Sequence, residues 1–273
     1  MPVADHFTHL LLTRFNTSLE FSPSLKRLDR KWLEARLILF EQYCLPSVVT
    51  QSCPNFKWLV FCDADSPKWF KEKMDAYGDL LLPVYIEGPA TDQVIARSVA
   101  TAGIVSSQYL ITTRLDSDDA IGANHLRLVQ RAFKRQSRTF LLFPFGLQLY
   151  RGQLFNTYWQ SNPFLSMIER ISTDGSFTTV MCVEHNLVRT AGEVQCIFSV
   201  PQWLQVIHGA NLQNILRGWP RLSRREPSAF RNLSLEQVSA SMLTLLSYST
   251  MALMMRGKRL QQRVAGSIRR TCG

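Results

Sequence analysis

Residues 109–119 read YLITTRLDSDD, a short apolar run that ends in a cluster of carboxylates. The run Tyr109–Leu115 is rich in β-branched and aromatic residues, a composition that favours a buried strand. In an open α/β sheet, ligands bind beyond the carboxyl ends of the strands. Asp116, Asp118 and Asp119 therefore lie where such a sheet would place a binding site.

Strand-like and helical patterns alternate along the chain before this stretch. Apolar runs of strand length are separated by segments whose apolar residues recur at helical spacing. This rhythm predicts an α/β fold, with a mixed, mostly parallel sheet flanked by helices. The predicted strands are 6–15, 57–63, 80–86 and 109–115, and the predicted helices are 31–43, 68–77 and 92–106.

From residue 139 the pattern changes to short strands separated by turns. The stretch TFLLFPFGLQLYRGQLFNTYW (139–159) contains turn signals at Phe145-Gly146 and at Arg151-Gly152. We expect these strands to form an antiparallel addition to the same sheet.

Charge is unevenly distributed along the chain. The 273 residues are 46% hydrophobic, which is enough to bury a core and excludes a disordered chain. Of the formal net charge of +10, residues 217–273 carry +9, from eleven basic and two acidic side chains. The nearly neutral body excludes a protein that coats nucleic acid, so we expect no nucleic-acid partner. We predict one domain over residues 1–220 and a helical, basic extension over 221–273.

Cysteine usage and the first residues bear on the compartment. The six cysteines form no CxxC pair and fit a reducing cytosol. Residues 1–9 are not typical of a signal peptide. The apolar segment 242–255 is too short to span a bilayer, but the basic residues that follow it are typical of a membrane-surface helix. We expect a cytoplasmic protein, peripheral at the inner face of an anionic membrane; an oligomer contact or a solvated end is the alternative for this tail.

The clustered carboxylates of Asp116, Asp118 and Asp119 also point to a metal. They repel one another unless a cation lies between them, and oxygen ligands suit Mg²⁺ or Mn²⁺. Ala120 and Ile121 exclude a calcium loop of the EF-hand kind. The alternative is a solvated acidic turn that caps the following helix.

Residues 94–121, VIARSVATAGIVSSQYLITTRLDSDDAI, resemble nucleotide-sugar-dependent glycosyltransferases of the GT-A (Rossmann-like) fold. That resemblance lies in an arginine on a helix, then a strand, then an Asp-x-Asp motif. Over roughly residues 5–220 the chain is similar to the bacterial rhamnosyltransferase family. The further stretches that carry this likeness are TRFN (13–16), FKWLVFCDADSP (56–67), NPFLSMIER (162–170) and WLQVIHGANLQN (203–214).

The resemblance implies roles for residues at the strand ends. It places Thr13, Arg14 and Asn16 near the base or the diphosphate of the donor. Asp63 and Asp65 would accept hydrogen bonds from the base or the ribose. Each of the two acids has the alternative role of capping the helix that follows.

For the metal and the phosphates, the resemblance implies five further residues. Arg97 would face a phosphate, and Asp116 would bind the ribose. Asp118 would bind the metal, Mn²⁺ or Mg²⁺, and Asp119 would orient the donor sugar or add a ligand. His208 would approach the metal or the diphosphate. Two alternatives stay open: Arg97 as a surface cation whose place Arg114 takes, and His208 as a buried histidine bonded to a carbonyl.

The implied reaction moves a sugar, with rhamnose suggested by the resemblance alone, from a UDP- or dTDP-linked donor to a hydroxyl of a glycan or lipid-linked glycan. Inversion requires a carboxylate that takes the acceptor proton. Glu169 and Glu184 are the candidates, and Asp119 joins them among the catalytic residues. Aromatic side chains in the segment before Glu169 could form a platform for the acceptor, with Trp159 the best candidate; core packing is the alternative for most of them. They are Tyr150, Phe155, Tyr158, Trp159 and Phe164.

Two other functions compete with this interpretation. The stretch VFCDADSP also resembles the first motif of haloacid-dehalogenase-like phosphatases, with Asp63 as nucleophile and Asp65 as acid. That class needs a phosphate-binding lysine further along, and none occurs over residues 74–133. A non-catalytic nucleotide-sugar-binding protein at a membrane surface is the second alternative.

Overall fold

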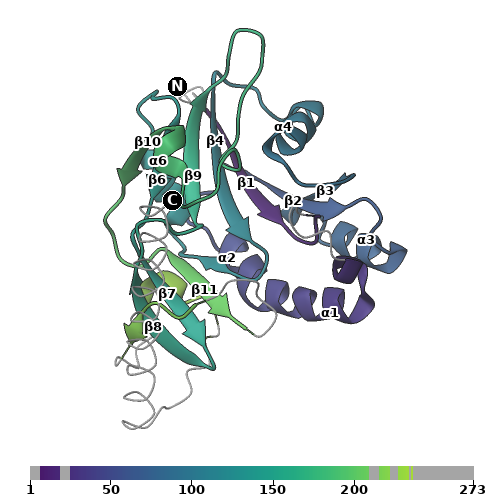
Figure 1. Ribbon diagram of the computed structural model, residues 1–273, viewed down its shortest axis with the longest axis vertical. Helices are drawn as coiled ribbons and strands as arrows, with labels where there is room; N and C mark the ends of the chain where they lie inside the picture. Colours follow the sequence, from purple (N-terminus) through teal and green to yellow (C-terminus); the bar gives the residue numbers. More distant parts are fainter. Residues whose placement is uncertain (1–6, 19–24, 209–214, 222–226, 234, 236–273) are drawn as a thin grey trace, which may run out of the picture.

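The computed structural model describes residues 7–18, 25–208, 215–221, 227–233 and 235. These residues form two β-sheets with helices packed against them (Figure 1). The larger sheet has seven strands in the order β10-β6-β9-β4-β1-β2-β3, and the second has five in the order β12-β8-β7-β11-β5. The strands β1 and β4, which carry the acidic motif and the residues beside it, are central in the larger sheet.

The larger sheet is mixed and mostly parallel, which confirms the predicted fold class. β1 pairs in parallel with β2 and β4, and β2 pairs in parallel with β3. Only β9 runs against its neighbours, β4 and β6. The strands are β1 (Phe7–Arg14), β2 (Lys57–Asp63), β3 (Leu82–Ile86), β4 (Tyr109–Asp116), β6 (Thr139–Leu142), β9 (Leu165–Arg170) and β10 (Glu193–Cys196).

Helices cover both faces of this sheet because side chains alternate along each strand. Leu11 of β1 packs in a core with residues of α1, α2, α3 and α5. Its neighbours Leu10 and Leu12 pack in a second core with residues of α4 and α6. The α-helices are α1 (Arg30–Leu39), α2 (Leu45–Val49), α3 (Lys68–Asp75), α4 (Asp92–Thr101), α5 (His125–Arg131) and α6 (Val188–Ala191).

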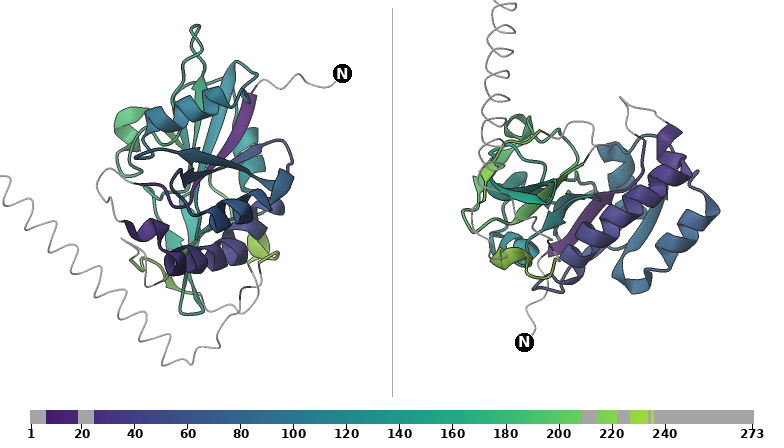
Figure 2. Two further views of the ribbon diagram at one scale, coloured as in Figure 1. Left: turned by 90° about the vertical axis from the view of Figure 1, so that its right-hand side faces the viewer. Right: turned by 90° about the horizontal axis from the view of Figure 1, so that it is seen from below.

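Helix α1 positions part of the site. Asp29 caps it by accepting a hydrogen bond from the backbone N–H of Trp32 at 3.0 Å. The predicted helix over 31–43 continues past α1 as a π-helical turn, η2 (Phe40–Cys44). Leu39 packs against the core of the second sheet, and α1 lies beside that sheet in the view from below (Figure 2). Short 3₁₀ turns, η1 (Leu25–Leu28), η3 (Gly78–Leu80) and η4 (Ser228–Phe230), complete the helical elements.

The strands after residue 139 do not all join the larger sheet, contrary to the prediction. Of the strands within residues 139–159, only β6 joins the larger sheet, whereas β7 and β8 form an antiparallel hairpin in the second sheet. The predicted turn at Arg151-Gly152 is confirmed, with φ of 50° and 73°. The strands of this sheet are β5 (Ala120–Ile121), β7 (Phe145–Tyr150), β8 (Gln153–Tyr158), β11 (Trp203–Ile207) and β12 (Trp219–Pro220).

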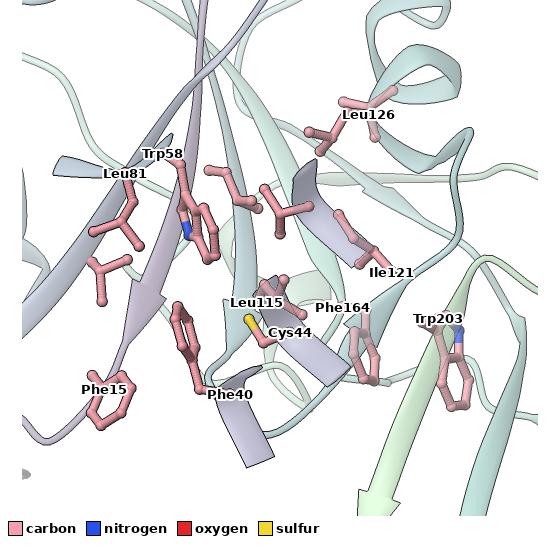
Figure 3. Close-up of a cluster of buried hydrophobic side chains, with 14 of the residues drawn as sticks. Phe15, Phe40, Cys44, Trp58, Leu81, Leu115, Ile121, Leu126, Phe164 and Trp203 are labelled. Carbon is pink, nitrogen blue, oxygen red and sulfur yellow. The ribbon is translucent and has the colours of Figure 1, made fainter. Parts of the chain in front are cut away.

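The predicted turn at Phe145-Gly146 is wrong, because both residues lie inside β7. The glycine serves packing: a Cβ at Gly146 would lie 2.0 Å from the ring of Trp203. Trp203 stacks on Phe164, with ring centroids 5.0 Å apart (Figure 3). Close approach of an indole, and not a turn, is therefore the reason for glycine here.

Most of the predicted extension over 221–273 lies outside the described residues, and the apolar and basic segments 242–255 and 256–270 lie entirely outside them. Across the described ranges, no helix combines the length and the apolar character needed to cross a bilayer.

Candidate active site

Several of the predicted residues meet where the central parallel strands end. The register of β1 and β4 places Arg14 beside Asp116 and Thr13 beside Leu115. β2 pairs with the other side of β1 and ends at Asp63. Because parallel strands present their carboxyl ends at one edge of the sheet, these residues share a site although they are far apart in sequence.

Asp116 lies between two arginines. Arg114 Nη2 lies 3.1 Å from Asp116 Oδ2, and Arg14 Nη2 lies 3.8 Å from Oδ1. Burial alone would raise the pKa of Asp116, but the attraction of Arg114 and Arg14 outweighs burial and lowers the pKa to about 2. The carboxylate is therefore ionised at neutral pH, and its side chain is 31% exposed, so that it can accept hydrogen bonds from a ligand.

Asp118 has a different set of partners. Arg36 Nη1 of α1 donates to Asp118 Oδ2 at 2.5 Å, and His208 Nε2 lies 2.8 Å from the same oxygen. Asp118 itself is 5% exposed. Leu115 and Cys44 belong to the buried cluster drawn in Figure 3, so the acidic turn follows directly from the apolar core.

Asp119 faces the second sheet. Its Oδ1 accepts a hydrogen bond from the backbone N–H of Val206 on β11 at 2.8 Å. Burial, and then repulsion from Asp118 and Asp116, raise the pKa of Asp119 well above its ordinary value. The contact ties the acidic turn to β11, which gives Asp119 a positioning role.

The pair Asp118 and His208 suits a divalent cation. Carboxylate oxygen and imidazole nitrogen are both ligands that Mn²⁺ accepts. Asp118 Oδ2 and His208 Nε2 form a hydrogen bond of 2.8 Å, which a cation held by both atoms would replace. In the described part of the chain, no group of three His, Cys, Asp or Glu residues is placed to hold a metal. The remaining ligands would therefore come from a bound anion.

Three buried polar atoms beside the acidic turn have no hydrogen-bond partner among the described residues. They are Ser117 Oγ, Arg36 Nε and Arg114 Nε. Leaving such groups unpaired costs free energy, and buried polar groups are nearly always satisfied. Two guanidinium donors and a hydroxyl around a carboxylate pair are the arrangement expected of a site whose ligand supplies acceptor oxygens.

Asn16 and Asp63 form a second polar network beside β1 and β2. Asn16 Oδ1 accepts from the backbone N–H of Asp63 at 3.2 Å, and Asn16 Nδ2 donates to Ser66 Oγ at 2.9 Å. Arg27 Nε donates to Asp63 Oδ2 at 2.7 Å, and Asp63 Oδ1 accepts from the backbone N–H of Asp65 at 2.8 Å. Both oxygens of Asp63 are used within the fold, which disfavours a phosphatase nucleophile, and neither bond caps α3, which follows Pro67 without a side-chain cap.

Two residues predicted for the donor site point elsewhere. Thr13 is fully buried, and its Oγ1 accepts a hydrogen bond from the indole of Trp58 at 2.9 Å. Arg97 is exposed, because α4 packs on the sheet through Ile95 and Val99 and turns Arg97 outward. Thr13 is therefore used within the fold, and the exposure of Arg97 fits its alternative role as a surface cation.

The two candidate bases lie at opposite edges of the sheet. Glu169 of β9 pairs with Leu110 near the start of β4, whereas Asp116 ends that strand. The stretch from residue 110 to residue 116 spans about 20 Å. The structure therefore places Glu169 away from the site, contrary to its prediction as a catalytic base. The reason is that β9 runs antiparallel to β4. Glu184 is exposed and lies within electrostatic reach of Arg14 and Arg114.

Sequence reasoning missed Arg27 and Arg36. Arg36 follows Leu33 by three positions and precedes Phe40 by four, so a cation lies on the buried face of a helix. A basic residue on the apolar face of a helix indicates that its side chain pairs with a buried carboxylate. Nothing in the local sequence around Arg27 identifies Asp63 as its partner.

The predicted aromatic platform is largely core. Phe155 and Phe164 are buried. Trp159 is covered on its face by the guanidinium of Arg217, 3.8 Å from the ring centroid, and by the edge of His185. One face of Trp159 is therefore occupied by Arg217, and its partial burial against the core favours the packing alternative.

Comparison with known proteins identifies the family. Residues 21–217 match the family described as "Putative rhamnosyl transferase". The chain belongs to this family. The mostly parallel sheet agrees with the fold class predicted above. None of the curated proteins matches the chain.

The solved structures that are similar to this member of the rhamnosyl transferase family are distant from it. TarS 1-349 from S. aureus in complex with UDP-GlcNAc is 12% identical with a TM-score of 0.46; the match covers 75% of this chain and 59% of that chain. A nucleotide-diphospho-sugar transferase from Desulfovibrio desulfuricans G20 is 10% identical with a TM-score of 0.38, and the match covers 73% and 82%. The family assignment therefore rests on the sequence match over residues 21–217 and not on these structures.

Proposed function

We propose that this chain transfers a sugar from a nucleoside-diphosphate donor to a hydroxyl of a glycan or lipid-linked glycan. The description of its family suggests that this sugar is rhamnose. The observation that carries the proposal lies at the edge of the larger sheet. There Asp116 and Asp118 lie among arginines whose buried Nε donors have no partner among the described residues. Such a site offers cationic donors to phosphate oxygens and carboxylates to hydroxyls. A UDP- or dTDP-linked sugar satisfies both.

The proposed role of each residue follows from the side chains with which it is paired. Asp116, held ionised by Arg14 and Arg114, would accept hydrogen bonds from the ribose. Arg14 and Arg114 would also face the diphosphate and stabilise the charge that grows on it as it leaves. These charges act in a largely buried site, where they are screened less than in water.

Asp118 and His208 would hold Mn²⁺ or Mg²⁺ together with the diphosphate. The ion supplies Lewis-acid stabilisation of the leaving group when it is bound. This chain's own part would be to hold one carboxylate oxygen and one imidazole nitrogen next to each other beside the diphosphate. Asp119 would keep the acidic turn in place through its bond to β11.

Glu184 would accept the proton of the attacking hydroxyl in an inverting reaction. It is exposed, and it lies near the arginines that would hold the leaving group. A carboxylate in this position is the kind of group that takes the proton of an attacking hydroxyl.

The surroundings of the reaction form the remaining part of the proposal. We place the transferase domain over residues 1–220 and assign 221–273 to a helical, basic extension. Its basic side chains would bring the domain to an anionic membrane on the cytoplasmic side, where a lipid-linked acceptor is presented. Binding of the full chain to anionic and to neutral vesicles tests this part separately from the chemistry.

Binding of donor nucleotides tests the site. We expect UDP or dTDP with Mn²⁺ to raise the melting temperature by about 5 °C or more at saturating ligand. Asp118→Asn should lose this metal-dependent rise, whereas Asp79→Asn, which changes an exposed acid on η3, should keep it. Mass spectrometry of reactions with a panel of nucleotide sugars and acceptors then identifies the product. Equal stabilisation of Asp118→Asn and the unaltered protein would contradict the proposed site.

A further inference from the structure

Arg36 and His208 share one oxygen of Asp118. The guanidinium reaches Asp118 Oδ2 from α1, at 2.5 Å, and the imidazole reaches it from beyond β11, at 2.8 Å. Asp118 is 5% exposed, so these contacts are formed largely out of water. A cation that belongs to the protein therefore already occupies the carboxylate that a metal would use.

The fold holds Arg36 in this place. Its guanidinium lies over the ring of Trp32, 5.2 Å from the centroid, one helical turn earlier on α1. The helix itself is anchored by the buried side chains of Leu33 and Leu37. Moving the guanidinium away from Asp118 thus requires another anion that offers it at least equal interactions.

The guanidinium has unused capacity for such an anion. Its Nε is buried and has no hydrogen-bond partner among the described residues. The planar fork of an arginine matches two oxygens of a phosphate, which supplies more acceptors than the single oxygen of Asp118. A diphosphate beside Asp118 would satisfy Nε and could draw the positive charge from the carboxylate.

We propose that Arg36 is a resident cation that occupies Asp118 until the donor diphosphate binds, and so keeps a divalent ion from binding alone. The inference rests on the proposed function, because it requires that nucleotide and metal share this site. Two cations on one carboxylate oxygen repel each other, whereas the diphosphate can hold both. Metal and nucleotide therefore bind cooperatively, and Arg36 is the positioning residue that couples them.

Binding of Mn²⁺ alone tests the inference without any turnover. Free Mn²⁺ is titrated by electron paramagnetic resonance against the full chain and against Arg36→Met, which keeps the length of the side chain without its charge. We expect Arg36→Met to bind Mn²⁺ about tenfold more tightly, since a like charge at this range shifts an ionic equilibrium by that order. Arg30→Met, on the same helix but exposed and paired with Glu34, should bind Mn²⁺ as the unaltered chain does.

The same titration with UDP present measures the coupling. UDP should tighten Mn²⁺ binding strongly in the unaltered chain and much less in Arg36→Met. Arg36→Lys, which retains the charge, should stay close to the unaltered chain. Should Arg36→Met fail to fold, Arg36→Gln provides the same neutralisation with a hydrogen-bond donor retained.

Two results would overturn the inference, and they differ in what they say of the proposed function. If UDP and Mn²⁺ bind together but neutral variants of Arg36 bind Mn²⁺ no more tightly, Arg36 is not the competing cation and the proposed function stands. If no variant binds Mn²⁺ with or without UDP, the inference fails together with the metal part of the proposed function. Transfer activity with a nucleotide sugar then decides whether the transferase itself stands.

Discussion

Single residues at the acidic turn have separate environments although they are neighbours in sequence. Asp116 is paired with Arg14 and Arg114, while two positions later Asp118 is paired with Arg36 and His208. Successive positions of the turn face different sides of the sheet edge, so each carboxylate meets cations from different elements. This division supports one role in hydroxyl binding and another in cation binding.

The two glutamates provide a matched test at the residue scale. We expect Glu184→Gln to lower the rate of transfer about 100-fold or more, because a general base contributes about that much. Affinity for the donor nucleotide, measured by calorimetry, should change little. Glu169→Gln removes the same charge at the opposite edge of the sheet and should leave the rate near that of the unaltered protein. A slow Glu169→Gln with an active Glu184→Gln would reverse the assignment.

At the scale of elements, the second sheet supports the site from one side. β11 provides the backbone N–H that holds Asp119, and β7 pairs with β11 in parallel. Gln148 of β7 is fully buried, and its Oε1 accepts from the backbone N–H groups of Arg217 and Gly218. The hairpin thus fixes the segment that carries Arg217, which covers Trp159.

Gly146 tests this packing of elements. A methyl group there would meet the ring of Trp203 at 2.0 Å, so we expect Gly146→Ala to lower the free energy of unfolding by about 1–3 kcal/mol. Urea unfolding followed by tryptophan fluorescence and circular dichroism measures the change. In the double variant Gly146→Ala/Trp203→Leu, the total loss should be smaller than the sum of the two single losses. If the two single losses in the free energy of unfolding add strictly, the clash with Trp203 is not the cause of the destabilisation by Gly146→Ala.

At the scale of the whole molecule, two histidines are buried in neutral form. His9 Nε2 lies 2.9 Å from Thr113 Oγ1, and its Nδ1 lies 3.1 Å from Gln130 Nε2. Burial, and then His125, lower the pKa of His9 to about 3. Burial lowers the pKa of His125 to about 4, although its bond to the Gln202 carbonyl opposes the shift.

These histidines predict how stability depends on pH. Below pH about 6.5 the unfolded chain takes up protons that the folded chain excludes, so stability is complete above that pH and falls as pH decreases toward 4. Each histidine adds up to about 1.4 kcal/mol per pH unit to the slope. Urea unfolding between about pH 7 and pH 5 measures the slope, which should be smaller in His9→Gln. An unchanged slope in that variant would show that His9 is protonated in the folded protein.

The sequence determined the fold class and the place of the site. Alternating apolar runs and helical patterns predicted the parallel strands, and YLITTRL followed by three acids predicted a binding edge at the end of β4. These features are local: strand pattern, helix period and clustered charge can be read over a few neighbouring residues. The sequence also indicated His208, which the structure brings to Asp118.

Only the tertiary structure decided which cations meet which acids. Arg36 reaches Asp118 from a separate helix, Arg27 reaches Asp63, and Glu169 lies at the opposite edge because β9 runs antiparallel to β4. Strand direction, register and helix rotation set these contacts across many residues of chain. No local pattern encodes such long-range geometry, because it results from the packing of whole elements against one another.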